Sequence, residues 1–178
     1  PNYNSVIVAN EIARDLHIPV VQVQHHYAHI LSCMAENNVF DSVIGLSLDG
    51  TGYGDDGTIW GGEILICTPY TYTRVGNIQP FFQTGGDLFA KEGWRAALVF
   101  LYDIFHEDTS RICKILNICS DKEYQIQSKI IKNNIRTIKS TSCGRLFDAV
   151  SAILGICNRS SFEGEASTAL MYEAELYE

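Results

Sequence analysis

Residues 20–30 read VVQVQHHYAHI, and residues 48–54 read LDGTGYG. The run Val20–Gln24 is rich in β-branched residues and too short for a helix, so it predicts a buried strand. The histidine segment predicts a helix that continues to about Glu36. Ser42–Asp49 places large apolar residues at alternate positions and predicts a second strand. Two histidines, a strand-end aspartate and a glycine-rich segment, in this order, indicate a metal and phosphate site.

The histidine helix has two chemically different faces when it is projected at about 100° per residue. One face carries the core-forming side chains Tyr27, Ile30, Leu31 and Met34. The nearly opposite face carries His25, His29, Ser32 and Cys33. The core is therefore complete without either of these histidines. For this spacing taken alone, two histidines that merely face solvent are the commoner explanation.

Asp49 makes this pair of histidines a candidate metal site. The i, i+4 spacing places the imidazoles of His25 and His29 within reach of one ion, as in helical zinc motifs. Asp49 ends a strand, which is where α/β proteins tend to place ligand-binding groups. Two neutral imidazoles and one carboxylate leave a divalent ion with an uncompensated positive charge. We therefore expect either a ligand phosphate or a further carboxylate, and the sequence beyond Glu178 is a candidate source of the latter.

The segment after Asp49 alternates glycine with other residues. Such a segment allows backbone N–H groups to point inward as an anion-binding nest. A plain hairpin turn is the commoner explanation, and neither G-x-G-x-x-G nor a Walker motif is present. Adjacency to the candidate metal ligands favours a phosphorylated ligand, because metal ions and phosphates are often bound together.

The rest of the chain predicts an α/β layout followed by a mostly helical portion. The expected elements are a helix over Val6–Leu16, strands over Thr58–Cys67 and Thr71–Ile78 after a turn at Asp55–Gly57, a helix over Trp94–Phe105, one or two helices within Ser110–Asn134, a helix through Leu146–Leu154 and a last helix after Gly164. A change of pattern near Pro80–Gly86 divides the chain into an α/β lobe, residues 1–82, and a mostly helical portion, residues 83–178.

Composition excludes several classes of function. The formal net charge of -8 disfavours general binding to nucleic acid, which requires clustered cations. No apolar run reaches the length of a membrane span. The 6 cysteines contain no C-x-x-C pair, so we expect reduced thiols in the cytoplasm. The sequence starts at Pro1 and stops in a helical pattern at Glu178, so we expect a piece of a longer protein.

Five motifs in order resemble one family. They are QHHYAH at 24–29, DGTGYG at 49–54 with TIWGGE at 58–63, GGD at 85–87 with Trp94-Arg95, SCGRLFDA at 142–149, and FEGEA at 162–166. This order resembles the C-terminal, Kae-like domain of the HypF carbamoyltransferases, which is similar to the tRNA threonylcarbamoyl-adenosine transferases and to the O-carbamoyltransferases. The resemblance implies a partial actin-like ATPase (ASKHA) fold, with a mixed sheet and flanking helices.

The resemblance also implies functional residues. Domains of this family bind iron or zinc through the H-x-x-x-H pair, which corresponds to His25 and His29, and through an aspartate that corresponds to Asp49. The glycines that follow line a phosphate-binding turn, and a helix aspartate contacts the ribose. The implied phosphate- and nucleotide-binding residues are Gly50, Thr51, Gly52, Tyr53, Gly54, Asp148 and Gly164.

The implied activity is carbamoyl transfer. In this family, carbamoyl phosphate and ATP give carbamoyl adenylate in a neighbouring domain, and the matched domain passes the carbamoyl group to the C-terminal cysteine of the protein HypE during NiFe hydrogenase maturation. The resemblance thus implies a divalent iron or zinc ion, ATP or carbamoyl adenylate, carbamoyl phosphate as donor, and a HypE-like acceptor. It implies neither a nucleic acid nor a membrane partner.

The sequence also departs from the family pattern. Tyr27 stands where the family usually has a third histidine, on the apolar face of the helix. The acylphosphatase, zinc-finger and adenylate-forming domains are missing, as are the early strands of the lobe and a C-terminal glycine-rich segment with a metal-binding aspartate. We therefore expect part of a transfer domain. Two alternatives remain: a binding module for nucleotide or HypE that does no chemistry, and a metal-dependent phosphohydrolase.

Overall fold

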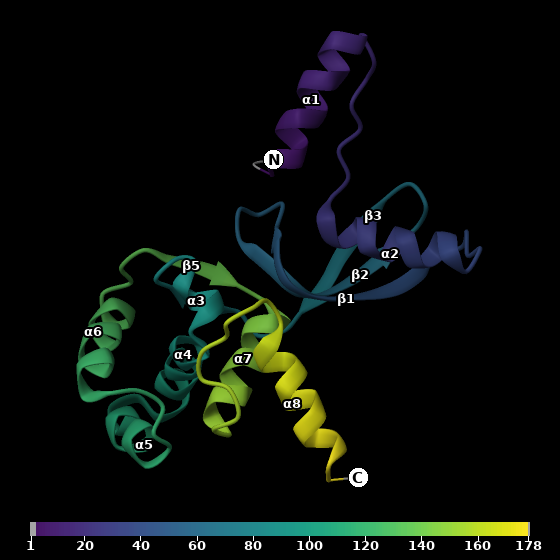
Figure 1. The fold of residues 1–178 in the computed structure, drawn as a ribbon. Helices are drawn as coiled ribbons and strands as arrows, with labels where there is room; N and C mark the ends of the chain where they lie inside the picture. The colour runs from purple at the N-terminus through teal and green to yellow at the C-terminus, as the bar shows by residue number, and fades with distance from the viewer. Residues whose placement is uncertain (1–2, 178) are drawn as a thin grey trace.

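The computed structural model describes residues 3–177 (Figure 1). Pro1 and Glu178, on which the expectation of a longer protein rested, lie outside these residues. The helices are α1 (Asn4–Leu16), α2 (His25–Glu36), α3 (Leu88–Lys91), α4 (Gly93–Phe105), α5 (Thr109–Ile115), α6 (Asp121–Lys132), α7 (Cys143–Ile153) and α8 (Glu165–Glu175), with a 3-10 turn, η1 (His106–Asp108). The strands are β1 (Val43–Tyr53), β2 (Ile59–Cys67), β3 (Tyr72–Asn77), β4 (Phe81–Thr84) and β5 (Thr137–Ser140).

Within the described residues the strands form one mixed sheet. Its order is β1-β2-β5-β4, and β3 also pairs with β2. β1, β2 and β3 form an antiparallel meander, β5 joins β2 in parallel where Ile59 pairs with Ser140, and β4 is antiparallel to β5. The predicted α/β fold with a mixed sheet and flanking helices is confirmed. Because the sheet takes strands from both sides of residue 82, the proposed division of the chain remains a prediction.

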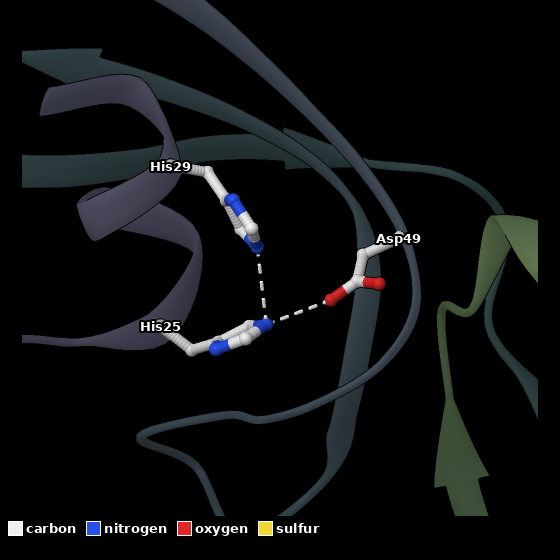
Figure 2. A group of neighbouring side chains, drawn as sticks. All are labelled: His25, His29 and Asp49. Carbon is white, nitrogen blue, oxygen red and sulfur yellow. Dashed lines mark hydrogen bonds and ion pairs between the residues drawn. The ribbon is translucent and has the colours of Figure 1, made fainter. Parts of the chain in front are cut away.

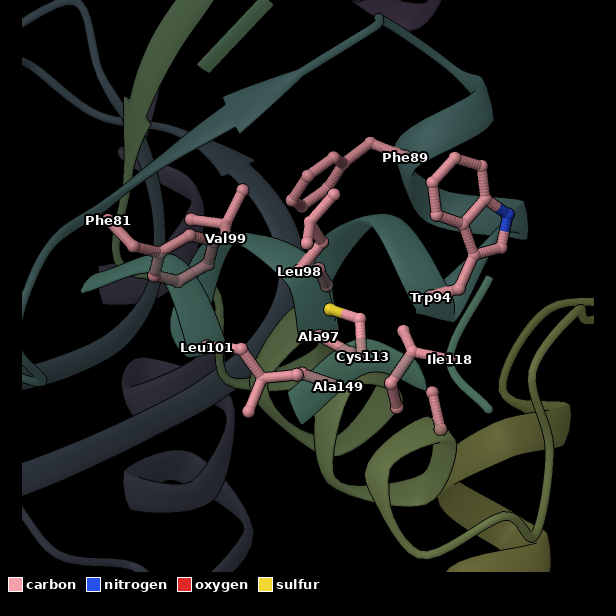
Figure 3. Close-up of a cluster of buried hydrophobic side chains, with 12 residues drawn as sticks. Phe81, Phe89, Trp94, Ala97, Leu98, Val99, Leu101, Cys113, Ile118 and Ala149 are labelled. Atoms are coloured by element: carbon pink, nitrogen blue, oxygen red, sulfur yellow. The ribbon is translucent and has the colours of Figure 1, made fainter. Parts of the chain in front are cut away.

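Two groups of buried apolar side chains hold the fold together. The larger one centres on Phe89, Leu98 and Ile118, and it packs α4 against neighbouring helices (Figure 3). The smaller one lies between α2 and the meander and consists of Tyr27, Ile30, Met34, Trp60, Leu65 and Cys67. The predicted apolar face of the histidine helix therefore does pack on the sheet. This packing fixes how the helix is rotated.

Gly45 allows α2 to lie close to β1. A Cβ placed on Gly45 would overlap the side chain of Ile30. On the other face of β1, the large apolar residues Ile44, Leu46 and Leu48 are 63–74% exposed, a face that the sequence pattern did not distinguish as open. The close approach of α2 to β1 therefore depends on the small residues of the strand and not on its large apolar ones.

The predicted strand at Val20–Gln24 is wrong. These residues form an irregular connection between α1 and α2, and Val21 is 83% exposed. β-branched residues favour a strand only where a neighbouring strand offers a pleated surface to pack on. Residues 3–177 offer none here, since α1 projects away from the sheet (Figure 1). The predicted helix over Val6–Leu16 is confirmed, but its apolar stripe, Val8, Ile12 and Leu16, is exposed.

The helical portion contains two short strands that the sequence did not predict. β4 and β5 have 4 residues each, too few to show an alternating pattern. They form because each pairs with the other along its whole length. Helices α4, α6, α7 and α8 and the two strands after Asp55–Gly57 occur close to their predicted positions, Ser110–Asn134 contains most of α5 and all of α6, and the short helix α3 was not predicted. None of the helices within residues 3–177 combines the length and the apolar character needed to cross a membrane.

Candidate metal and phosphate site

The start of α2 places the two histidines. Gln24 caps the helix, since its side-chain oxygen accepts a hydrogen bond from the Tyr27 amide at 3.0 Å. Tyr27 and Ile30 pack on the sheet, and His25 and His29 extend from α2 toward Asp49 of β1. Figure 2 shows the three side chains pointing toward one another from α2 and β1. The predicted juxtaposition of His25, His29 and Asp49 is thus present.

The distances within this cluster suit a metal ion. His25 Nε2 lies 2.8 Å from Asp49 Oδ2, and His29 Nε2 lies 3.2 Å from His25 Nε2. One potential ligand atom from each residue lies within 4.8 Å of the others. Two nitrogens bound tetrahedrally to zinc are about 3.3 Å apart, given Zn–N distances of about 2.0–2.1 Å. The donor set of two imidazoles and one carboxylate fits zinc or iron.

The cluster borders a groove between α2 and β1. The groove has a volume of about 510 Å³, and its lining includes His29, Cys33, Ser47 and Asp49. His29 is exposed, whereas His25 and Asp49 are partly buried. A small ligand could therefore reach the cluster from the His29 side.

The surroundings of Asp49 favour its charged form. Burial alone would raise the pKa of the Asp49 carboxyl, but hydrogen bonds from His25 and from the Gly50 amide outweigh burial and hold this pKa below its ordinary value. The adjacent His26 has a lowered pKa because burial, reinforced by His25, disfavours its protonated form. The site therefore offers an ionised carboxylate, the form in which this group binds metals, beside the neutral ring of His26.

The glycine-rich segment differs from the predicted loop. β1 continues through Tyr53, with an irregularity in its pairing between Leu48 and Gly52. Gly50, Gly52 and Gly54 do not have the positive φ angles that an anion nest requires. The expectation of a nest after Asp49 is therefore wrong, because pairing with β2 extends past the aspartate. The chain turns after the end of β1, at Asp55–Gly57, as predicted.

Gly52 has no side chain where the histidine rings come closest to β1. A Cβ on Gly52 would lie 2.5 Å from His26 Cε1 and 2.7 Å from His25 Cδ2. Gly54 is similarly covered by the indole of Trp60. These glycines thus allow side chains to lie over the strand, a role different from the predicted phosphate contact, which remains a proposal together with Thr51 and Tyr53.

We expect Gly52→Ala to weaken Zn²⁺ binding by about 10-fold, because both rings must move and displaced supporting contacts typically cost a metal site this much. Gly50→Ala is the matched control. The nearest atom to a Cβ on Gly50 is Arg145 Nη2 at 3.9 Å, an ordinary contact. Competition titration with a chromophoric chelator measures both affinities. Equal affinities for the two variants would contradict the prediction.

Helix α7 brings the SCGRLFDA motif, residues 142–149, against Gly50 of β1. The Ser142 hydroxyl caps α7 by accepting from the Arg145 amide, and it donates to the Gly50 carbonyl. A Cβ on Gly144 would lie 2.8 Å from Gly50 Cα, so the first turn of α7 contacts β1 directly. The SCGRLFDA motif therefore borders the candidate site.

Asp148 lies on α7 as a buried carboxylate. Its Oδ2 is 3.0 Å from Nε of Arg145, and both side chains are largely inaccessible. Burial raises the pKa of the Asp148 carboxyl, and Arg145 opposes that rise. Gly164 is the N-cap of α8 with a φ of 79°, and within 4 Å its Cβ position meets only Ser167 of the same helix. The structure does not bring Gly164 together with the metal cluster, and nucleotide contacts by either residue remain proposals.

Sequence reasoning missed two features of the site. The first is His26, which is fully buried beside the predicted ligands. The second is a hydrogen-bond and ion-pair network on β2 and β3. Buried Glu63 accepts from the amides of Gly61 and Gly62 and pairs with Arg74 at 2.6 Å. Arg74 also stacks on Trp60, 4.1 Å from the ring centroid. The W-G-G-E sequence was the available signal, since a glutamate next to paired glycines can satisfy their amides.

Several known proteins are similar to this chain in sequence and in fold. Residues 45–177 match the family described as carbamoyltransferase, Kae1-like domain, second subdomain, and residues 1–36 match the HypF Kae1-like domain. The chain is 41% identical over 170 residues to the probable carbamoyltransferase HypF of Methanocaldococcus jannaschii, covering 96% of this chain. It spans 22% of that relative's length.

Two crystal structures are similar. One is of full-length HypF in a phosphate- and nucleotide-bound form, with a TM-score of 0.80 and 39% identity over 92% of this chain and 21% of that chain. The other is T. kodakarensis HypF, with a TM-score of 0.85 and 36% identity over 96% of this chain and 23% of that chain.

The fold, together with these matches, defines a Kae1-like domain of the carbamoyltransferase type. The two matched segments include His25 and His29 on one side and Asp49 with the SCGRLFDA motif on the other. The chain belongs to the HypF carbamoyltransferase family. The resemblance inferred from the five motifs is confirmed.

Proposed function

We propose that this chain is part of the transfer domain of a HypF-type carbamoyltransferase and carries its metal-binding residues. The observation that carries the proposal is the convergence of His25, His29 and Asp49, with potential ligand atoms within 4.8 Å of one another. Membership of the family supports carbamoyl transfer as the activity. The relative crystallised with phosphate and nucleotide supports ATP or carbamoyl adenylate as the ligand.

In the proposed reaction, the thiolate of a HypE-like C-terminal cysteine attacks the carbamoyl carbon of carbamoyl adenylate, which the whole protein would form from carbamoyl phosphate and ATP. The thiol has first lost its proton to solvent; a C–S bond then forms, the bond from this carbon to the phosphate oxygen breaks, and AMP leaves with the electron pair. A bound iron or zinc ion would neutralise phosphate oxygens and polarise the carbonyl. The free cysteines fit a cytoplasmic setting for this chemistry.

The chain's own residues have three parts to play in this proposal. His25, His29 and Asp49 hold the ion. The first turn of α7, which meets β1 where Gly144 approaches Gly50, presents backbone N–H groups for phosphate oxygens, and Gly50–Gly54 border this position. Asp148, held by Arg145, is a candidate for orienting the nucleotide.

A chimaera tests the activity, because this chain spans only part of its relatives. Replacing the matched segment of the Methanocaldococcus protein by this chain is expected to preserve carbamoylation of a HypE C-terminal peptide, measured by mass spectrometry. Asp49→Asn in the chimaera is expected to reduce the rate by about 100-fold, as for loss of one preorganised electrostatic group.

Two other outcomes would replace the proposal. Nucleotide binding by the chimaera with no transfer at all would favour the binding-module alternative. Release of inorganic phosphate from carbamoyl phosphate or ATP by this chain alone, abolished by Asp49→Asn, would favour the phosphohydrolase alternative.

A further inference from the structure

The amide of Gln24 is held in one orientation. Its Oε1 accepts from the backbone N–H of Tyr27 at 3.0 Å, and its Nε2 donates to the backbone carbonyl of Tyr53 at 3.0 Å. A backbone N–H can only donate and a carbonyl can only accept. The oxygen and the nitrogen of this amide therefore cannot be exchanged.

This orientation determines which nitrogen of His26 carries the proton. Gln24 Nε2 lies 3.2 Å from His26 Nδ1 and has a second N–H to donate. Nδ1 must therefore accept, which only a neutral imidazole with its hydrogen on Nε2 can do. The sequence Q-H-H thus fixes His26 as an Nε2–H donor.

The Nε2–H group of His26 is buried and has no hydrogen-bond partner within residues 3–177. The whole residue is 0% exposed, and its ring lies against the rings of His25 and Trp60 at centroid distances of 5.1 and 5.8 Å. One acceptor lies near it, Asp49 Oδ2, at 3.9 Å. An unpaired buried donor is costly, so a partner is expected in some state of the protein.

Metal binding would supply that partner. In the structure, Asp49 Oδ2 accepts from His25 Nε2 at 2.8 Å. An ion is bound through the lone pair of an imidazole nitrogen, so His25 Nε2 could not both bind an ion and donate to Asp49. A carboxylate ligand is normally held by a further donor behind it.

We propose that His26 is a positioning residue whose Nε2–H donates to the Asp49 carboxylate once His25 has turned its nitrogen to the metal. The hydrogen bond to Asp49 thereby passes from one histidine to its neighbour. The inference rests on the metal site of the proposed function and assigns His26 a role in holding a ligand, with no contact to the ion itself.

Two substitutions separate this role from simple packing. His26→Phe retains a ring of similar size and removes the donor, whereas His26→Gln keeps an amide N–H near the position of Nε2. We expect His26→Phe to weaken Zn²⁺ binding by about 10- to 100-fold, the usual effect of losing a residue that hydrogen-bonds to a metal ligand. His26→Gln is expected to recover most of the lost affinity. Chelator competition gives the affinities, and circular dichroism checks that each variant is folded.

A second measurement uses the unsubstituted chain and holds even if His26→Phe fails to fold. Long-range ¹H–¹⁵N spectra of the metal-free chain are expected to show His26 as the Nε2–H tautomer, which it keeps after Zn²⁺ is added. An Nδ1–H tautomer, or wild-type affinity in His26→Phe, would overturn the inference alone. A wild-type chain that takes up no Zn²⁺ would overturn the metal site and this inference with it.

Discussion

The double substitution His25→Ala/His29→Ala is expected to reduce Zn²⁺ bound to the purified chain from about one ion per chain to nearly none. Both imidazoles converge with Asp49, and the two nitrogens lie 3.2 Å apart, so the pair would supply two of the three proposed protein ligands. Loss of an outer-shell partner costs a site about 10- to 100-fold in affinity, and loss of two direct ligands is expected to cost more. Metal analysis after dialysis measures the change.

Histidines elsewhere in the chain provide the matched control. His17 and His106 are exposed, lie outside the cluster and have positive φ angles of 54° and 46°. Asparagine tolerates the left-handed conformation of His17, whereas the ψ of His106, -110°, lies outside that region, so circular dichroism checks that His17→Asn/His106→Asn is folded. This variant should bind as much zinc as the wild type. Zinc retained by His25→Ala/His29→Ala at the control's level would place the metal elsewhere.

Arg74→Met is expected to lower the free energy of unfolding by about 3–5 kcal/mol, the cost of removing one partner from a buried ion pair. Glu63 is 0% exposed, and Arg74 is the cation that faces it, with Nε 2.6 Å from its carboxylate. Methionine keeps an unbranched apolar stem against Trp60, so the substitution acts chiefly on the charge. Urea unfolding followed by fluorescence measures the loss.

Two further variants test the cause of this loss. In a Glu63→Gln background a neutral amide replaces the carboxylate, so Arg74→Met should lower the free energy of unfolding clearly less. A double-mutant cycle reports the difference as a coupling energy. Arg111→Met removes an arginine from an exposed pair with Asp108, whose side chains are about 70% exposed, and should stay within about 0.5 kcal/mol of wild type. Equal losses for Arg74→Met and Arg111→Met would exclude a burial effect.

The cluster of His25, His29 and Asp49 could be predicted because each of its parts depends on local periodicity. The apolar face of α2 fixes the direction of His25 and His29, and alternation in β1 places Asp49 beside them. The Glu63–Arg74 pair could not be found in this way. Its two residues are 11 positions apart, and they meet only through the register of β2 and β3, in which Leu65 pairs with Arg74.

Other failures have the same physical origin. β4 and β5 are stabilised by pairing between residues more than 50 positions apart, so their own four-residue sequences carry little signal. Conversely, Val20–Gln24 has strand-forming residues but no strand beside it within residues 3–177. His26 was passed over because its neighbours His25 and His29 share the helical spacing, while its importance depends on how Gln24 is hydrogen bonded.

The absence of a side chain at Gly45 sets the height of α2 above the sheet, since any larger residue would meet Ile30. The distances among His25, His29 and Asp49 therefore depend on how closely α2 packs on β1 at Gly45, four positions before Asp49. Donor chemistry and donor spacing are thus encoded by different residues. An imidazole or carboxylate in the cluster could be exchanged for another donor while the scaffold keeps the same distances, which makes this part of the fold a natural starting point for redesigning metal preference.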